Sequence, residues 1–249
     1  MKRLNTKTEH RDFIWYILKQ REKKNEVSDD EIVMNAALFI IAGSETTATQ
    51  LCGLMNYLLR DPERLKKLEG EVRGACKTEE DVNVRVLGVL PYMNACIEEG
   101  LRIFPPVPIG LLRRVPKGGS LIDGHTVPGG TSVCVSSWGA SHSANNFADP
   151  DSFIPERFLP SAPAKFANDI KKAAQPFSTG PRGCIGRNLT YVELRLVLGA
   201  LLWNFDVEFA EDGGKAWGPE GEFGGLKAFN VWEKRALVVR LRDVRGMSA

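Results

Sequence analysis

The chain has 249 residues, with 33 Lys and Arg against 31 Asp and Glu, so its formal net charge is only +2. This balance gives no electrostatic reason to expect nucleic acid or an anionic membrane as the main partner. A hydrophobic fraction of 43% is ordinary for a folded core and excludes wholesale disorder. The most apolar segment near the start, residues 36–42, is far shorter than the roughly 20 residues of a spanning helix, and no signal peptide is visible. We therefore expect a soluble chain without a transmembrane segment.

The cysteines are an odd number, are widely spread and form no Cys-x-x-Cys pair. They are Cys52, Cys76, Cys96, Cys134 and Cys184. This pattern predicts neither a disulfide framework nor a zinc site, and it favours a reducing compartment.

The first predicted helix follows a capping box formed by Ser28 and Glu31. Apolar residues over 32–40 predict that this helix is mostly buried. A polar patch, residues 43–47, interrupts the apolar pattern, which resumes at Leu51.

Two further helices have clear boundary signals. Asp61 followed by Pro62 predicts an N-cap and a first helical residue, and the helix that follows has a narrow apolar stripe. Another helix is predicted to begin near Pro91 and to end before Pro105, because a proline disfavours helical backbone at the residue before it.

From residue 115 to residue 135 the pattern changes to short β segments separated by Gly and Pro. Asp123 and Gly124 predict a hairpin turn. Residues 143–183 are rich in Pro, Asn, Asp and Ser and have little periodicity. So long an irregular stretch in a compact domain is uncommon and usually functional.

Regular structure is predicted again in the last quarter of the chain. The pattern indicates a helix over residues 189–203, a strand over 205–209 and a terminal strand over 236–241. The Gly-rich stretch 213–225 is predicted to be a surface loop.

Cys184 lies in the run Phe177–Gly186, directly before the predicted helix. The free N–H groups and the dipole of a helix N-terminus stabilise a thiolate over a thiol. The glycines of this run permit tight turns and leave room for a flat group near the backbone. Taken alone, a cysteine in a Gly-rich turn is more often structural, so the surrounding residues decide between the two interpretations.

This run matches in full the Phe-x-x-Gly-x-Arg-x-Cys-x-Gly signature of the cytochrome P-450 family, the haem-thiolate monooxygenases. The resemblance implies that Cys184 is the axial thiolate ligand of haem iron and that Arg182 pairs with a haem propionate. It also implies that Phe177 shields the sulfur and that Gly186 lets the following helix lie against the porphyrin.

A second segment, Ala42-Gly43-Ser44-Glu45-Thr46-Thr47, resembles the oxygen-activating helix motif of the same family. There, small residues such as Ala42 and Gly43 open a groove, and an acid and an alcohol, here Glu45 and Thr46, relay protons to dioxygen. Taken alone, the patch is more typical of a solvated polar helix face. Because it interrupts a strongly apolar helix, we expect it to face an internal cavity.

Glu99 and Arg102 match the Glu-x-x-Arg motif of the family, and their spacing places both side chains on one helix face. Such a pair is usually a surface salt bridge worth less than about 1 kcal/mol. The resemblance instead implies a buried cluster with Arg157, from the segment Pro155–Phe158, that supports the cysteine loop. These three residues are predicted to be structural.

Arg113 lies where the family often has another propionate-binding arginine, after a proline-rich segment. Arg114, beside it, leaves this assignment ambiguous, and we favour Arg113.

The resemblance covers nearly the whole chain and implies a mainly α fold with small β-sheets (α+β), the C-terminal haem-binding part of the cytochrome P-450 fold. We expect one partial domain over residues 1–249, from the oxygen-activating helix to the C-terminus, without the N-terminal anchor and the substrate-lid half. The implied cofactor is haem b, held by the cysteine thiolate. The chain is expected to be a fragment or a natural truncation.

The implied reaction inserts one atom of O2 into a small hydrophobic organic substrate, with electrons from NADPH through a reductase partner. Several short sequence runs are similar to those of fungal microsomal members, which implies secondary-metabolite or xenobiotic oxidation. Full-length relatives are expected at the cytosolic face of the endoplasmic reticulum. Two alternatives remain open: a non-catalytic remnant, and a haem-binding protein without monooxygenase activity.

Overall fold

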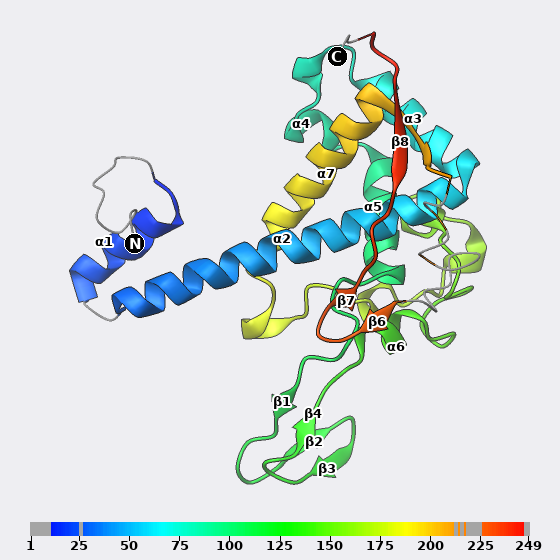
Figure 1. Cartoon of the computed structure of the whole chain (residues 1–249). Helices are drawn as coiled ribbons and strands as arrows, with labels where there is room; N and C mark the ends of the chain where they lie inside the picture. The colour runs from blue at the N-terminus through cyan, green and yellow to red at the C-terminus, as the bar shows by residue number, and fades with distance from the viewer. Residues whose placement is uncertain (1–10, 25–26, 212–213, 215–216, 218–225, 247–249) are drawn as a thin grey trace. The chain divides into compact units, whose positions relative to one another are not determined.

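A computed structural model describes residues 11–24, 27–211, 214, 217 and 226–246 of the chain. The chain divides into two compact units, residues 1–45 and residues 46–249. As predicted, the elements are mainly α-helices with small antiparallel sheets (Figure 1).

The described part of the first unit contains helix α1 (Phe13–Lys24) and the first half of helix α2 (Asp29–Arg60). The predicted capping box at the start of α2 is confirmed: the backbone N–H of Ser28 donates to Glu31 Oε2 over 2.8 Å, and the Glu31 N–H donates to Ser28 Oγ over 3.2 Å. The helix runs unbroken through the polar patch at 43–47. The polar patch therefore interrupts the apolar pattern of the helix but does not end the helix.

The prediction that the start of α2 is mostly buried is wrong. Ile32 is buried, but Leu38, Phe39, Ile40 and Ile41 are exposed. The apolar pattern predicts a helix with an apolar face, whereas burial also needs a neighbouring element to cover that face. Of the four exposed side chains, Phe39 has a ring contact with Phe13 of α1, at 6.2 Å between centroids.

In the described residues, α2 is long and apolar enough to cross a membrane by length and composition. Core helices of proteins without any membrane segment pass the same test, so the absence of a transmembrane segment stays a prediction. The helix has 32 residues and is much longer than residues 36–42, its most apolar segment.

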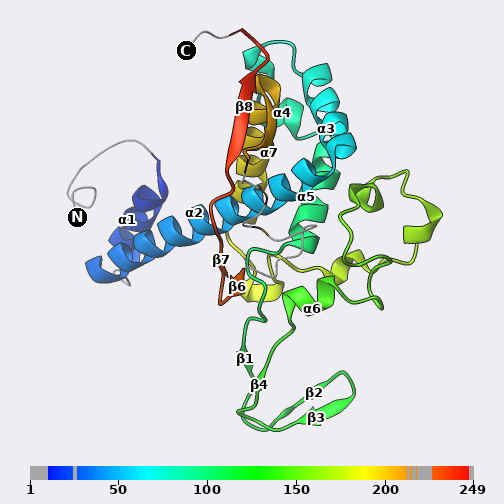
Figure 2. The same ribbon diagram turned by 45° about the vertical axis from the view of Figure 1, so that its right-hand side comes forward.

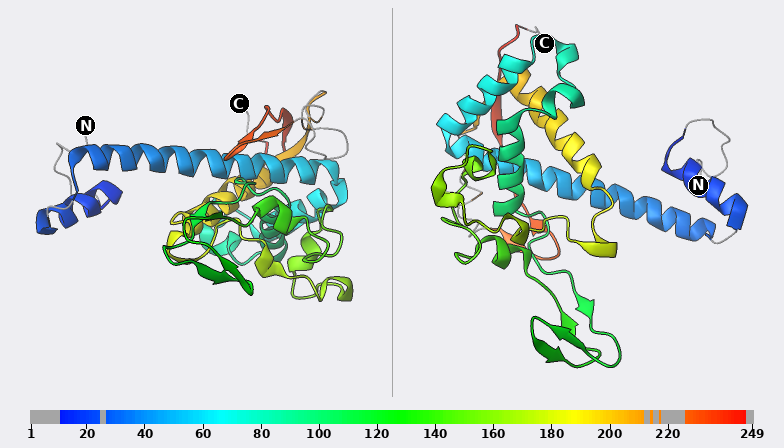
Figure 3. Two further views of the ribbon diagram at one scale, coloured as in Figure 1. Left: turned by 90° about the horizontal axis from the view of Figure 1, so that it is seen from below. Right: turned by 180° about the vertical axis from the view of Figure 1, so that it is seen from behind.

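The second unit is built around helices α3 (Pro62–Ala75), α5 (Pro91–Ile103) and α7 (Arg187–Asn204), which pack against one another. Figure 1 and the reverse view in Figure 3 both show α5 and α7 side by side. Two shorter helices, α4 (Val84–Leu87) and α6 (Ser137–Ser141), flank them. Most of α5 is buried, so this helix forms the centre of the core.

The boundaries of α3 and α5 confirm the sequence prediction. Asp61 caps α3 by accepting the N–H of Arg64. The N-terminus of α5 is capped from another helix, because Glu71 accepts the N–H groups of Tyr92 and Met93 at 2.8 and 2.7 Å. A carboxylate in α3 thereby satisfies helix donors that have no partner within α5.

In the part of the chain that the structure describes, the strands form four two-stranded antiparallel sheets. The pairs are β1 (Arg113–Arg114) with β4 (Ser132–Val133), β2 (Ser120–Ile122) with β3 (His125–Val127), β5 (Phe205–Phe209) with β8 (Val239–Asp243), and β6 (Lys227–Ala228) with β7 (Trp232–Glu233). The predicted hairpin turn is present, with φ of 47° at Asp123 and 77° at Gly124. Figure 2 shows β2 and β3 at the end of the ribbon formed by β1 and β4. The terminal strand β8 begins and ends later than the predicted 236–241.

Residues 143–183 are irregular, as predicted, apart from short 3₁₀ turns. The 3₁₀ turns whose full extent lies in the described residues are Glu79–Asp81, Pro155–Phe158, Ala164–Phe166, Lys171–Ala173 and Gly180–Arg182. The predicted surface loop at 213–225 lies outside the described residues except for Gly214 and Trp217.

Candidate functional site

The loop that carries Cys184 is closed by its own backbone. The Cys184 N–H donates to the carbonyl of Phe177 over 2.8 Å, and the Gly183 N–H donates to the carbonyl of Gly180 over 2.9 Å. The turn needs left-handed backbone at Gly180, with φ of 73°, which glycine adopts at little cost. The loop ends at Gly186, the N-cap of α7. This arrangement leaves Cys184 an exposed, free cysteine just before a helix N-terminus.

Cys184 lines a cavity of about 440 Å³ in the second unit. Segments far apart in the sequence meet there. The predicted site residues on its wall are Thr46, Arg113, Phe177, Arg182 and Cys184, from α2, β1 and the cysteine loop. These five residues bring a thiol, two guanidinium groups and a hydroxyl to a largely apolar wall.

The structure separates the two candidate arginines of β1. Arg113 lines the cavity, whereas Arg114 is not part of its wall. The reason is local, since successive side chains of a strand point to opposite faces. Arg182 lines the cavity too, and among the described residues it has no hydrogen bond or ion pair. Both arginines are exposed.

The predicted oxygen-activating motif is divided between the two units. Thr46 lines the cavity of the second unit, and Thr47 is buried and donates a hydrogen bond to Glu193 over 3.1 Å. Ala42, Gly43 and Glu45 belong to the first unit, where Ala42 and Gly43 are exposed and Glu45 is half-buried. The structure thus places Thr46 at the cavity and leaves the positions of the other three as predictions.

Gly186 does not line the cavity, but its surroundings are open. A Cβ added at Gly186 would meet only the Cys184 Sγ, at 3.8 Å, which is an ordinary contact. No protein atom therefore requires glycine at this position, and the space beside the sulfur is free for another group.

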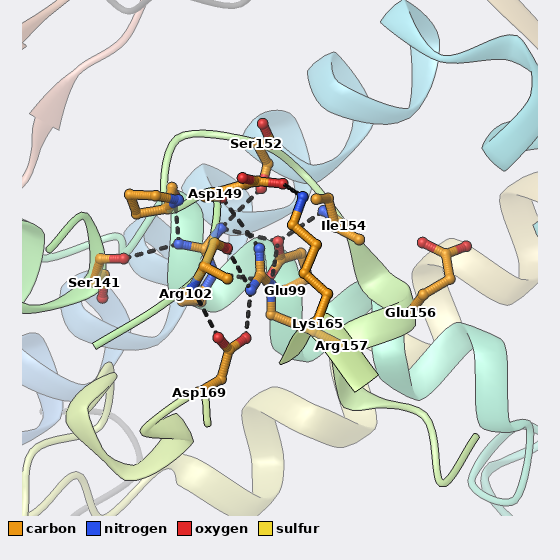
Figure 4. A network of polar contacts seen from close by, with 12 residues as sticks. Glu99, Arg102, Ser141, Asp149, Ser152, Ile154, Glu156, Arg157, Lys165 and Asp169 are labelled. Carbon is orange, nitrogen blue, oxygen red and sulfur yellow. Dashed lines mark hydrogen bonds and ion pairs between the residues drawn. The ribbon is translucent and has the colours of Figure 1, made fainter. Parts of the chain in front are cut away.

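Glu99, Arg102 and Arg157 lie together and are 0% exposed. Figure 4 shows the Glu99 carboxylate between the two guanidinium groups. Glu99 accepts hydrogen bonds from Arg102 Nε at 2.7 Å and from Arg157 Nε at 3.2 Å. It also accepts the backbone N–H of Ile154 at 2.7 Å. These bonds join α5 to the turn at 155–158.

The remaining guanidinium N–H groups hold the irregular segment in place. They donate to backbone carbonyls, those of Ser141, Pro150 and Ser152 for Arg102 and those of Ala148 and Asp149 for Arg157. A segment without regular hydrogen bonding must find other partners for its buried carbonyls, and two buried arginines supply them here. This explains how a stretch with no periodicity takes a fixed course before it reaches the cysteine loop.

Asp169 is a fourth member of this cluster, and sequence reasoning missed it. Its Oδ2 accepts a hydrogen bond from Arg157 Nη1 at 2.5 Å, and its side chain is 2% exposed (Figure 4). Two buried guanidinium groups then face two carboxylates, so the cluster is electrically neutral. A count of charges could have predicted such a residue, because two buried arginines and one glutamate leave one positive charge that needs an acidic partner.

Comparison with known proteins identifies the family. The family model for cytochrome P-450 matches residues 1–225, so the chain belongs to the cytochrome P-450 family. Similar proteins include cytochrome P-450 monooxygenase aba2 of Botryotinia fuckeliana, which is 45% identical over 241 residues, 95% of this chain and 45% of the relative.

Two further relatives match over 99% of this chain. Cytochrome P-450 monooxygenase lcsI of Purpureocillium lilacinum is 43% identical over 247 residues, 46% of its own length. Cytochrome P-450 monooxygenase astA of Talaromyces wortmannii is 44% identical over 246 residues, 48% of its own length. The chain thus spans about half the length of the curated relatives it matches.

Proposed function

We propose that this chain is the haem-binding part of a monooxygenase that inserts one oxygen atom of O2 into a small hydrophobic organic substrate. The observation that carries the proposal is the cavity of the second unit, where the exposed thiol of Cys184 shares a wall with Arg113, Arg182 and Thr46. Membership of the cytochrome P-450 family and relatives named monooxygenases support it.

The residues on the cavity wall fit haem b. Among the described residues, no three His, Cys, Asp or Glu side chains are grouped to hold a metal ion. A single thiolate is enough for iron that brings a porphyrin as its other ligand. Arg113 and Arg182 would bind the two propionates, and the open space beside Gly186 suits the edge of a flat ring.

When bound, haem supplies the oxygen activation, and a thiolate ligand favours cleavage of the O–O bond. The role of the protein is to hold and orient the reactants. Cys184 would bind the iron from one side, Phe177 would cover the sulfur, and the apolar wall would exclude water from the substrate. The Thr46 hydroxyl would donate a proton into the cavity, and Glu45 would resupply it.

The electrons would come from NADPH through a reductase partner, which membership of the cytochrome P-450 family supports. We propose secondary-metabolite or xenobiotic oxidation as the setting, and the cytosolic face of the endoplasmic reticulum as the location. The exposed apolar side chains of α2 are compatible with a membrane-associated protein.

The test is the carbon-monoxide difference spectrum of the reduced, haem-supplemented chain. We expect a strongly red-shifted Soret band that Cys184→Ala abolishes. Cys134→Ala is the matched control, because Cys134 is also an exposed, free cysteine on the wall of the same cavity. Its variant should keep the band.

Other outcomes would contradict the proposal. Haem bound without the red-shifted band, or a band that survives in Cys184→Ala, would show that Cys184 is not the ligand. A normal band without any product in the presence of a reductase would favour a haem-binding protein without monooxygenase activity.

A further inference from the structure

Gln50 is a buried polar residue in the wall of the cavity. Its side chain belongs to α2 and is 0% exposed. Gln50 follows Thr46 by four residues, so the two side chains lie on one face of the helix, about 5–6 Å apart at their Cβ atoms. Both residues line the cavity that also contains Cys184.

The amide of Gln50 has no protein partner. Neither Oε1 nor Nε2 makes a hydrogen bond within the described part of the chain, although both atoms are fully buried. Buried amides are almost always hydrogen-bonded, because water otherwise solvates them better than an apolar interior does. Gln50 therefore indicates a partner that lies outside the described residues of this chain.

The neighbours of the amide restrict where this partner lies. A Cβ added at Gly100 of α5 would be 2.7 Å from Gln50 Nε2, so the amide fills the space left by a missing side chain. The same added Cβ would lie 3.2 Å from Leu54 Cδ1, so this side of the amide is closely packed and apolar. Because Gln50 also lines the cavity, the cavity is the remaining direction from which a small partner can approach the amide.

We propose that Gln50 anchors an ordered water molecule, which bridges toward the Thr46 hydroxyl and extends the path of proton supply to it. The amide is neutral and offers both a donor and an acceptor, which suits water and gives no preference for an ion. A side chain with no exposure admits only a small guest. Two side chains one helical turn apart are also at a separation that a single water spans.

This proposal rests on the proposed function only for the role of Thr46. The water site itself depends on the cavity and on the amide. Gln50 acts here as a positioning residue, since it holds the water and does not touch the substrate.

The first experiment is a high-resolution crystal structure of the haem-loaded protein and of its Gln50→Met variant. Methionine matches glutamine in length and removes both hydrogen-bonding atoms. We expect a water within hydrogen-bonding distance of the Gln50 amide and of Thr46, and its loss in the variant. A direct protein partner for the amide, or a contact without water, would overturn the proposal.

Thermal unfolding of the same variant gives an independent test of the water. Replacing a dry, unpartnered amide with methionine removes a desolvation cost and raises the melting temperature by several degrees. Replacing a hydrated amide removes its hydrogen bonds, so we expect no rise. Gln175→Met is the matched control, because Gln175 lines the same cavity but is exposed and donates to the carbonyl of Lys172. A higher melting temperature in Gln50→Met alone would overturn the proposal.

The role of the water is tested by the coupling of NADPH consumption to product, with a reductase and O2 supplied. When proton supply fails, O2 takes up two electrons and two protons and leaves as hydrogen peroxide. We expect Gln50→Met to at least double the peroxide formed per NADPH. The control Gln20→Met, at an exposed residue of α1 that does not line the cavity, should leave it unchanged. An unchanged share in Gln50→Met would overturn the role of the water, whereas failure of the proposed function would already appear as a missing carbon-monoxide band in the unaltered protein.

Discussion

Arg102 and Arg157 are completely buried, whereas Arg113 and Arg182 are exposed on the wall of the cavity. Arg102 makes five hydrogen bonds, which is the full donor capacity of a guanidinium group. Arg182 makes no hydrogen bond to any described residue. The guanidinium groups that hold the fold use their donors within the protein, whereas Arg182 keeps its donors available for the ligand that we propose. If that proposal holds, burial and donor use distinguish the structural arginines from the binding arginines.

The largest effect is expected from removing the shared carboxylate of the buried cluster. Glu99→Gln leaves two guanidinium groups facing only Asp169, so a positive charge stays buried without a partner. We expect a loss of about 3–5 kcal/mol in the free energy of unfolding, measured by denaturant titration.

The matched control for this change is the neighbouring residue. Glu98→Gln alters a half-buried carboxylate that accepts one hydrogen bond from the Tyr191 hydroxyl at 2.7 Å. Its loss should cost about 1 kcal/mol. If the two variants were equally stable, the buried cluster would not be the structural centre described here.

A second pair of variants separates a buried from an exposed carboxylate on the same segment. Asp169→Asn removes the charge that neutralises Arg157, and we expect a loss of about 1–3 kcal/mol. Asp149→Asn removes the ion pair with Lys165, in which both side chains are largely exposed, and should cost less than about 1 kcal/mol. Asparagine is the suitable replacement at Asp149 because it tolerates the φ of 45° at that position.

The measurement is again the free energy of unfolding from denaturant titration. Equal losses in the two variants would show that Asp169 is not a member of the buried cluster.

The third comparison is between Arg182, which lines the cavity, and Arg114, which does not. Arg182→Ala should leave the stability of the chain unchanged, because this guanidinium has no partner in the described residues. It should weaken haem binding by roughly 10–100-fold, the value of one charge-assisted hydrogen bond. Arg114→Ala is the control, since Arg114 is exposed and does not line the cavity.

Haem titration followed by absorbance measures the effect. Equal weakening in the two variants would indicate a general loss of positive charge and not a propionate contact at Arg182.

The features predicted well from sequence depend on residues three or four positions apart. The Ser28 cap, the start of α3 after Asp61 and the turn at Asp123 are each fixed by one short segment, so the chemistry of that segment decides the structure. The cysteine loop was also recognisable, because its turns and its cysteine are contiguous in the chain.

The features that were missed depend on distant partners. Asp169 pairs with Arg157 across an irregular loop, and no periodic pattern connects them. The exposed residues of α2 show the converse case, since an apolar pattern does not tell whether another element covers it. Gln50 has no motif at all, and only its burial without a partner reveals it.

The smallest expected effect is a pH dependence at the border of the buried cluster. His142 follows Ser141, whose carbonyl accepts from Arg102, and its ring stacks on Trp138 at 3.7 Å between centroids. Burial, and then the charge of Arg102, lower the pKa of His142 below 6.5, against opposing contributions from the Trp138 carbonyl and Asp151. The unfolded chain then binds more protons than the folded chain between the lowered pKa and 6.5.

Stability linked to His142 should therefore be fully present above pH 6.5 and should fall as the pH drops toward the lowered pKa. Replacing the ring by His142→Gln removes this slope, so the difference in unfolding free energy between the two proteins should shift in favour of the variant as the solution is acidified. The measurement is denaturant unfolding of both proteins from pH 8 to pH 5, taken as a difference so that carboxylates common to both cancel. A difference that is constant with pH would show that folding does not lower the pKa of His142, contrary to its burial near Arg102.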